Sequence, residues 1–223
     1  MGFDGTAMRL LSLYRGERAA VRAHNFARVA SCPLAAIHRA VPENGTIVEV
    51  GAGRGLVAGY LALRAPGRTV LGIEPDPDKV AIANRCHVTG QVRLAVGDAD
   101  GSLPDRVDAV VVVDVLYLLS LARQDTLLAR AAQALRPGGR LVVKEMATEA
   151  GLKMWLTRAQ EHLAVRVLRW TRGGGDFVYR SPAGTAAIIE ASGLCHTWRR
   201  VDGALGVHPH VLIVGHKPRT VER

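Results

Sequence analysis

The chain is poor in the features that mark several protein classes. Its three cysteines, Cys32, Cys86 and Cys195, are odd in number and far apart, without the spacing of a zinc site or a disulfide framework. We therefore expect reduced thiols in a cytoplasmic protein that has no metal centre. No apolar run is long enough to span a bilayer, because Asp114 interrupts the longest one, over residues 109–119. The N-terminus also lacks the pattern of a signal peptide.

Aromatic residues make up only 4% of the 223 residues, and lysine occurs four times. Arginine therefore supplies nearly all of the net charge of +9, and it is spread along the chain. A nucleic-acid-binding surface combines clustered basic residues with aromatic side chains, so we expect no nucleic-acid partner. In contrast, hydrophobic residues reach 48%. This composition and length favour one α/β domain with a core of its own.

A glycine-rich stretch follows the first predicted strand. Residues 46–50 resemble a buried strand, and Gly51, Gly53 and Gly55 come directly after it, ahead of a helical pattern over residues 56–65. Glycine tolerates positive φ and has no Cβ, so a ligand can lie against bare backbone there. The start of the helix adds N–H groups that suit an anionic group. The pattern is typical of a nucleotide-type cofactor loop in a doubly wound sheet.

Two details of this loop separate the cofactor classes. A dinucleotide fingerprint has its third small residue three positions after the second glycine, where this chain has Leu56. A carboxylate, Glu49, lies inside the strand two residues before Gly51. Leu56, together with the early third glycine, Gly55, disfavours an NAD(P)-dependent oxidoreductase, which stays an alternative because a glycine loop alone is a weak indication.

Carboxylates also end the next predicted strands. Glu74 lies 23 residues beyond Gly51, where it can accept hydrogen bonds from both hydroxyls of a ribose. Asp98 and Asp114 end the third and fourth strands. Because the carboxyl ends of parallel strands meet at one edge of the sheet, these groups are expected at one ligand site. The strands after the first are expected at residues 69–73, 92–96, 108–113, within 135–145, and at 194–201 and 211–216.

Residues 46–145 resemble the class I S-adenosylmethionine-dependent methyltransferases. The resemblance rests on the acidic-x-Gly-x-Gly-x-Gly pattern from Glu49 to Gly55, on Glu74 and Asp98, and on the turn and strand within 135–145. It implies an α/β fold whose seven-stranded, doubly wound sheet has the order 3-2-1-4-5-7-6, with strand 7 antiparallel. It also implies S-adenosyl-L-methionine as the cofactor and S-adenosyl-L-homocysteine as its product.

The resemblance assigns a part of the cofactor to each matching position. The methionine portion would lie against Glu49, Gly51, Ala52, Gly53 and Gly55. The ribose would be held by Glu74 with Pro75 beside it, the adenine by Asp98 and Ala99, and the sulfonium would lie beside Asp114 and Val115. Amino-methyltransferases of nucleic acids carry two prolines just after the Asp114 position, and this chain has Val115 and Leu116 there.

We expect a single domain over residues 1–223. A helical cover over 1–41, with Tyr14 and His24 as residues that could face the cofactor, precedes the core over 46–146. The segment 147–181 carries a helical apolar face and a triple glycine, which suits a lid over the acceptor. A helix packed for stability or a homodimer interface explains that segment equally well. Residues 182–217 complete the sheet.

Methyl transfer from a sulfonium requires alignment and, for a hydroxyl acceptor, a general base. Among the side chains that could reach an acceptor, Glu145 and His24 are the first candidates; the others are Tyr117, His162, Tyr179 and His208. The aromatic residues of 147–181 favour a small hydrophobic or aromatic acceptor, as in secondary metabolism, with O-methylation preferred. A domain that binds the cofactor without catalysis is the remaining alternative.

Overall fold

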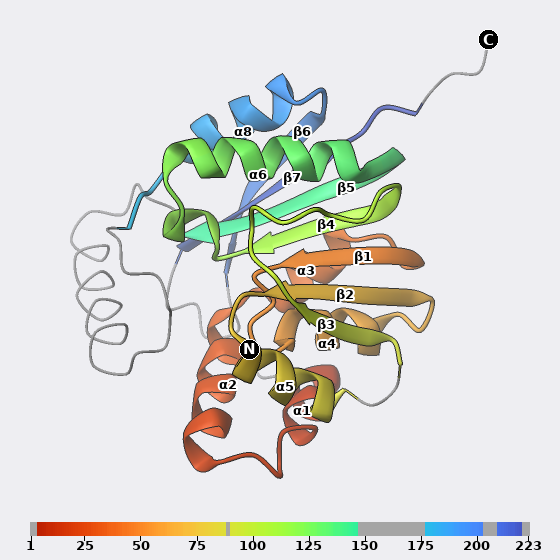
Figure 1. The fold of residues 1–223 in the computed structure, drawn as a ribbon, viewed down its shortest axis with the longest axis vertical. Helices are drawn as coiled ribbons and strands as arrows, with labels where there is room; N and C mark the ends of the chain where they lie inside the picture. The colour runs from red at the N-terminus through yellow and green to blue at the C-terminus, as the bar shows by residue number, and fades with distance from the viewer. Residues whose placement is uncertain (1–3, 88–89, 147–176, 203–208, 220–223) are drawn as a thin grey trace.

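The computed structural model describes residues 4–87, 90–146, 177–202 and 209–219. They form a seven-stranded sheet with helices on both faces (Figure 1). The strand order is β3-β2-β1-β4-β5-β7-β6, and β7 runs antiparallel to both of its neighbours. The predicted fold is therefore confirmed. Among the described helices, none has the length and hydropathy to cross a membrane.

The elements lie close to their predicted places. The strands are β1 (Gly45–Val50), β2 (Arg68–Glu74), β3 (Val92–Val96), β4 (Val107–Val113), β5 (Leu135–Met146), β6 (Cys195–Asp202) and β7 (Pro209–His216). The helices are α1 (Gly5–Ser12), α2 (Ala19–Ser31), α3 (Leu34–Ala40), α4 (Leu56–Arg64), α5 (Pro77–Cys86), α6 (Leu121–Ala134) and α8 (Pro182–Ala191), with a short 3-10 turn η1 (Leu116–Leu118). The largest difference is at β5, which begins at Leu135 and includes the turn-like residues 136–139.

The middle of the sheet is buried on both faces. In β4, all residues from Ala109 to Val113 are at most 4% exposed, as expected of a central parallel strand. Val111 and Val113 belong to the core beneath α1 to α5, whereas Val110 and Val112 belong to the core beneath α6 and α8. Burial on both faces fixes the register of β4, because a shift of one residue would exchange the two cores.

The parallel strands all place their carboxyl ends on one edge of the sheet. In Figure 1 the arrowheads of β1, β4 and β5 point toward the side on which α2 lies. The N-terminal segment, where a helical cover was expected, contains α1, α2 and α3. The proposed lid over 147–181 lies outside the described residues except for 177–181.

Candidate cofactor and acceptor site

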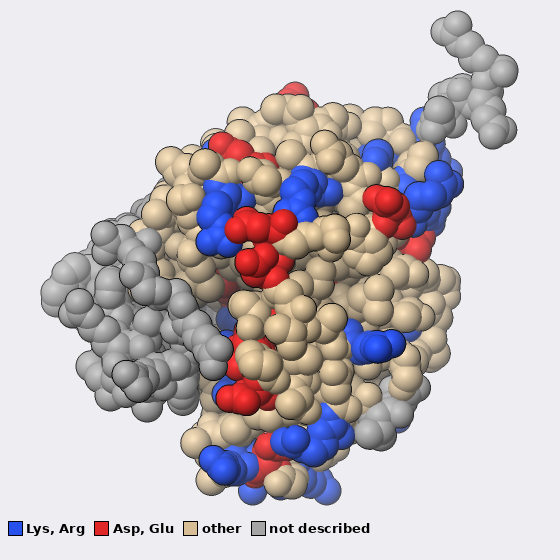
Figure 2. Space-filling view, viewed as in Figure 1, with Lys and Arg blue, Asp and Glu red and all other residues tan. Residues whose placement is uncertain are grey.

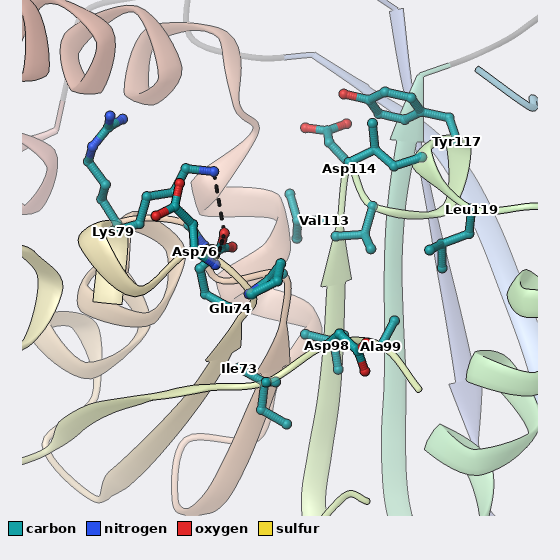
Figure 3. Close-up of a pocket in the computed structure, with 18 of the residues that line it drawn as sticks. Ile73, Glu74, Asp76, Lys79, Asp98, Ala99, Val113, Asp114, Tyr117 and Leu119 are labelled. Carbon is teal, nitrogen blue, oxygen red and sulfur yellow. Dashed lines mark hydrogen bonds and ion pairs between the residues drawn. The ribbon is translucent and has the colours of Figure 1, made fainter. Parts of the chain in front are cut away.

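A cavity of about 530 Å³ lies at the carboxyl edge of the sheet (Figure 3). Its lining comes from α2, the glycine loop, the ends of β2, β3 and β4, η1, and Phe177. The predicted site residues on this lining are His24, Gly51, Gly53, Glu74, Pro75, Asp98, Ala99, Asp114 and Val115. The topology thus brings most of the predicted positions to one cavity, as expected where neighbouring strands of a doubly wound sheet diverge.

The glycine loop has the backbone that its sequence requires. Gly51, Gly53 and Gly55 have φ angles of +73°, +57° and +74°, which favour glycine. Gly51 N donates to the carbonyl oxygen of Ile73 on β2 at 2.8 Å, which ties the loop to the neighbouring strand. A Cβ on Gly51 would overlap the side chain of Val115. The loop therefore packs closely against the end of β4 while its outer surface faces the cavity.

Glu49 lies behind the loop instead of on the cavity lining. It is 2% exposed, and its Oε2 accepts a hydrogen bond from Ala58 N in α4 at 2.8 Å. Burial raises the pKa of this carboxyl group to about 8. In this structure Glu49 joins β1 to the start of α4, and its contact with the methionine portion stays a prediction.

Tyr14, Ala52 and Gly55 are also absent from the lining, and their contacts with the cofactor stay predictions. The Tyr14 hydroxyl donates to the carbonyl oxygen of Arg54 and lies 2.8 Å from Nε2 of His87. Gly55 caps α4, and a Cβ there would approach the His87 ring at 3.2 Å. These residues support the loop from the protein interior, because the helices of the N-terminal segment and α5 pack behind it.

The carboxylates of β2 and β3 face the cavity. Glu74 accepts a hydrogen bond from Gly53 N at 2.9 Å and pairs with Lys79 Nζ at 3.3 Å, the dashed line in Figure 3. Asp98 accepts from Asp100 N at 2.9 Å, and Ala99 follows it on the same part of the lining. Both carboxylates thus lie where the resemblance assigns the ribose and the adenine, and those roles stay predictions.

Asp114 is a strained and strongly paired residue at the end of β4. It has a φ of +55°, which is uncommon for a residue other than glycine. Lys144 Nζ on β5 donates to its Oδ1 at 2.6 Å, and Arg28 Nη1 on α2 donates to its Oδ2 at 2.5 Å. These two cations hold the pKa of Asp114 far below its usual range, against the effect of burial. The carboxylate therefore stays ionised and is unsuited to act as a base.

Glu145, a predicted catalytic candidate, is not part of the cavity lining. Its Oε1 accepts hydrogen bonds from Val115 N at 3.2 Å and Leu116 N at 3.0 Å. Burial and the negative charge of Asp114 raise the pKa of Glu145 to about 8. In this structure Glu145 holds the chain where it leaves β4, and its catalytic role stays a prediction.

His24 is the predicted base candidate that does line the cavity. Burial, together with the positive charges of Arg54 and Arg28, lowers the pKa of His24 to about 4. The imidazole is therefore neutral at pH 7 and able to accept a proton. The candidates His162 and His208 lie outside the described residues.

An aromatic cluster borders the cavity near η1. The ring of Tyr117 stacks on Tyr179 at 5.6 Å between centroids and meets Phe177 edge-on at 5.5 Å. Tyr117 and Phe177 line the cavity. Gln124 on α6 fixes this arrangement, because its Nε2 donates to the carbonyl oxygen of Val178 at 2.9 Å. The chain after the proposed lid is thus anchored beside η1.

The described residues contain no group of three or more His, Cys, Asp or Glu side chains that could hold a metal ion. On the face shown in Figure 2, basic and acidic side chains occur side by side, without a continuous basic surface. Among the described residues, these observations indicate no metal site, and this face carries no continuous basic surface.

Comparison with known proteins supports the predicted family. Residues 48–143, somewhat less than half of the chain, match the model of a methyltransferase domain, Methyltransf_11. This match supports the predicted resemblance to the class I S-adenosylmethionine-dependent methyltransferases. Its sheet is shared by the pyocyanin biosynthetic protein PhzM, with a TM-score of 0.67 and 20% identity, over 92% of this chain and 60% of that one.

Two curated relatives resemble part of this methyltransferase. A fatty-acid O-methyltransferase of Mycolicibacterium smegmatis is 31% identical over 115 residues, 51% of this chain and 41% of the relative. The tetracenomycin polyketide synthesis 8-O-methyl transferase TcmO of Streptomyces glaucescens is 27% identical over 157 residues, 63% of this chain and 46% of the relative. The matching stretch thus spans less than half the length of each relative.

Sequence reasoning missed three residues that organise the site of this methyltransferase. Arg28 and Lys144 pair with Asp114, and Gln124 anchors residues 177–180. The contacts of Arg28 and Gln124 span 86 and 54 positions in the sequence, so local spacing gives no sign of them. Lys144, which directly follows the apolar residues 141–143 of β5, is the one detectable hint, because a buried charge requires a partner.

Proposed function

We propose that this protein transfers a methyl group from S-adenosyl-L-methionine to a small hydrophobic or aromatic acceptor. The supporting observation is the division of one cavity into two chemically different walls. Glu74 and Asp98 face it from β2 and β3, whereas His24, Tyr117 and Phe177 face it from the other side. The carboxylates suit an adenosine moiety, and the aromatic rings suit an apolar acceptor.

Methylation of an oxygen atom is the preferred reaction. The two relatives described above are both named as O-methyltransferases, one for fatty acids and one for a polyketide. A neutral imidazole facing the cavity suits an acceptor whose hydroxyl group must lose a proton. The acceptor proposed here is a small molecule, without a nucleic-acid partner; a homodimer through residues 147–181 stays a proposal from the sequence alone.

The residues divide the chemistry between positioning and proton transfer. When bound, S-adenosyl-L-methionine supplies an activated methyl group on a sulfonium. Glu74 and Asp98 would hold its adenosine, so that the methyl group faces Asp114 and Val115. His24 would accept the proton of the acceptor hydroxyl, because Asp114 is held by two cations and Glu145 by two backbone N–H groups. Closely packed walls would exclude water and align the acceptor.

Calorimetric titration tests the donor. We expect the protein to bind S-adenosyl-L-homocysteine and not NAD, and we expect Glu74→Ala to weaken that binding. Binding of NAD without binding of S-adenosyl-L-homocysteine would favour the oxidoreductase alternative.

Labelled S-adenosyl-L-methionine tests the reaction, with phenolic, fatty-acyl and amine acceptors offered in parallel. We expect turnover with an oxygen acceptor and a loss of about 10²–10⁴-fold in kcat for His24→Gln, the usual contribution of a general base. Phe177→Ala and Trp155→Ala should raise KM for the acceptor while the cofactor affinity stays unchanged. Cofactor binding without turnover on any acceptor would favour the non-catalytic domain.

A further inference from the structure

Four cationic side chains line the cavity, and three of them have a carboxylate partner. The pairs are Arg28 with Asp114 at 2.5 Å, Lys79 with Glu74 at 3.3 Å and Arg123 with Asp100 at 2.6 Å. The fourth is Arg54, in the middle of the glycine loop. Its guanidinium group makes no hydrogen bond or ion pair with any of the residues that the structure describes.

Arg54 is also partly withdrawn from water. Its Nε atom is buried and has no hydrogen-bond partner among the described residues. Burial lowers the pKa of Arg54, although the negative charges of Asp76 and Glu74 act to raise it. A buried charge without a partner is costly, so a bound anion would gain more here than on an exposed arginine.

The backbone presents this side chain at a fixed place. The Tyr14 hydroxyl holds the carbonyl oxygen of Arg54 from the interior, and Glu74 holds the N–H of Gly53. Arg54 therefore leaves the loop beside the bare backbone of Gly51 and Gly53, on the cavity lining.

Arg54 is one of three cations that act on His24. Burial lowers the pKa of His24, and the charges of Arg54, Arg28 and Lys79 lower it further. The carboxylates that act on Arg54 itself are those of Asp76 and Glu74, and Glu74 is paired with Lys79. Because Arg28 and Lys79 are neutralised by their own partners, Arg54 is the cation in this group that can accept an anion. A guanidinium group binds a carboxylate through two parallel N–H···O bonds, which fixes orientation as well as charge.

We propose that Arg54 binds a carboxylate group inside the cavity. The proposal rests on the proposed function, since that function supplies two carboxylates: the amino-acid end of the cofactor and, for a carboxylic acid acceptor, the acceptor itself. The position of Arg54 beside Gly51 and Gly53 favours the cofactor as the source of this carboxylate. The adenosine part of the cofactor is assigned to Glu74 and Asp98, further along the same cavity.

Two ligands that differ in the amino-acid portion test this proposal. S-adenosyl-L-homocysteine carries the carboxylate, and 5′-methylthioadenosine lacks the whole amino-acid portion. In calorimetric titrations, Arg54→Met should lose about 10–100-fold in affinity for the first ligand and bind the second as the wild type does. Arg54→Lys should restore part of the loss, since a lysine keeps the charge without the bidentate geometry.

Arg123→Met is the matched control, because Arg123 lines the same cavity but is paired with Asp100. Arg123→Met should change the affinities for the two ligands by the same factor, since both ligands contain adenosine. A selective loss for S-adenosyl-L-homocysteine in Arg54→Met alone supports the cofactor carboxylate.

The acceptor carboxylate has its own readout. If Arg54→Met leaves both affinities unchanged and raises KM for a fatty acid but not for the matching fatty alcohol, the carboxylate belongs to the acceptor and the proposal still stands. An equal loss for both nucleosides, or no effect on either ligand or acceptor, overturns it. If the wild type binds neither nucleoside, the proposed function itself has failed, and with it this proposal.

Discussion

The two walls of the cavity are held in place by different kinds of contact. On the donor wall, which comprises residues 50–55 and the ends of β2 and β3, backbone groups bind neighbouring backbone: Gly51 N donates to Ile73 O, and Gly97 N to Glu74 O. On the acceptor wall, which comprises α2, the end of β4 with η1, and residues 177–180, side chains connect distant segments, as Arg28 and Gln124 do. Single side-chain substitutions should therefore affect the acceptor wall more selectively than the donor wall.

The largest effect is expected where the acceptor wall contains a buried charge pair. Asp114→Ala should lower the free energy of unfolding by about 3–5 kcal/mol, because Lys144, which is 1% exposed, would lose its partner. Urea unfolding measures this change. Asp125→Ala breaks the more exposed pair with Arg180 and should cost less than about 1 kcal/mol. Equal losses in the two variants would contradict the pairing of Asp114.

The backbone of the glycine loop offers a direct test of the donor wall. Gly51→Ala should lower the free energy of unfolding by about 2–4 kcal/mol, since it combines a positive φ with overlap against Val115. It should also weaken binding of S-adenosyl-L-homocysteine in a calorimetric titration. Gly53→Ala is the control: its φ is also positive, but a Cβ would meet no atom within 4 Å, so only about 1–2 kcal/mol is expected.

Loss of the Gln124 side chain, which anchors residues 177–180, should affect acceptor binding and not cofactor binding. Gln124→Met removes the side-chain donor from the carbonyl oxygens of Leu119 and Val178, and one of two donors from that of Leu116, and should cost about 1–3 kcal/mol. KM for the acceptor should rise while the affinity for S-adenosyl-L-homocysteine stays unchanged. Gln133→Met, at an exposed position of the same helix, should change neither quantity. A loss of cofactor affinity in Gln124→Met would show that the walls are not independent.

The smallest effect concerns pH and the cover helix α2. The folded pKa of His24, about 4, lies below its unfolded value of 6.5. The unfolded chain therefore binds the extra proton first, so stability is fully present above pH 6.5 and is lost as the pH falls toward 4. His24→Gln should reduce the loss of unfolding free energy between pH 7 and pH 4.5 by about 1 kcal/mol, because the contribution of this half-buried group is partly screened by solvent. Chemical unfolding at pH 4.5 and pH 7 measures the difference; an unchanged slope would mean that another group is responsible.

Much of the donor wall could be predicted from the sequence because its causes are local. Three glycines in five positions require a tight loop, and the carboxylates Glu74 and Asp98 follow directly from the strands that precede them. The direction of a side chain beside the loop could not be predicted locally. Glu49 contacts α4 and Tyr14 contacts His87, and neither is part of the cavity lining.

The sequence by itself determined the glycine loop and the places of the strands along the chain, because alternating patterns and turn residues act over a few positions. The order of the strands in the sheet and the class of donor were expected from the resemblance to the methyltransferase family. Only the tertiary structure decided which charges are available. It paired Asp114 with Arg28 and Lys144, occupied Glu145 with two backbone N–H groups, and left Arg54 without a partner among the described residues. The physical reason is that the charge state of a buried group depends on neighbours that folding brings together from distant parts of the chain.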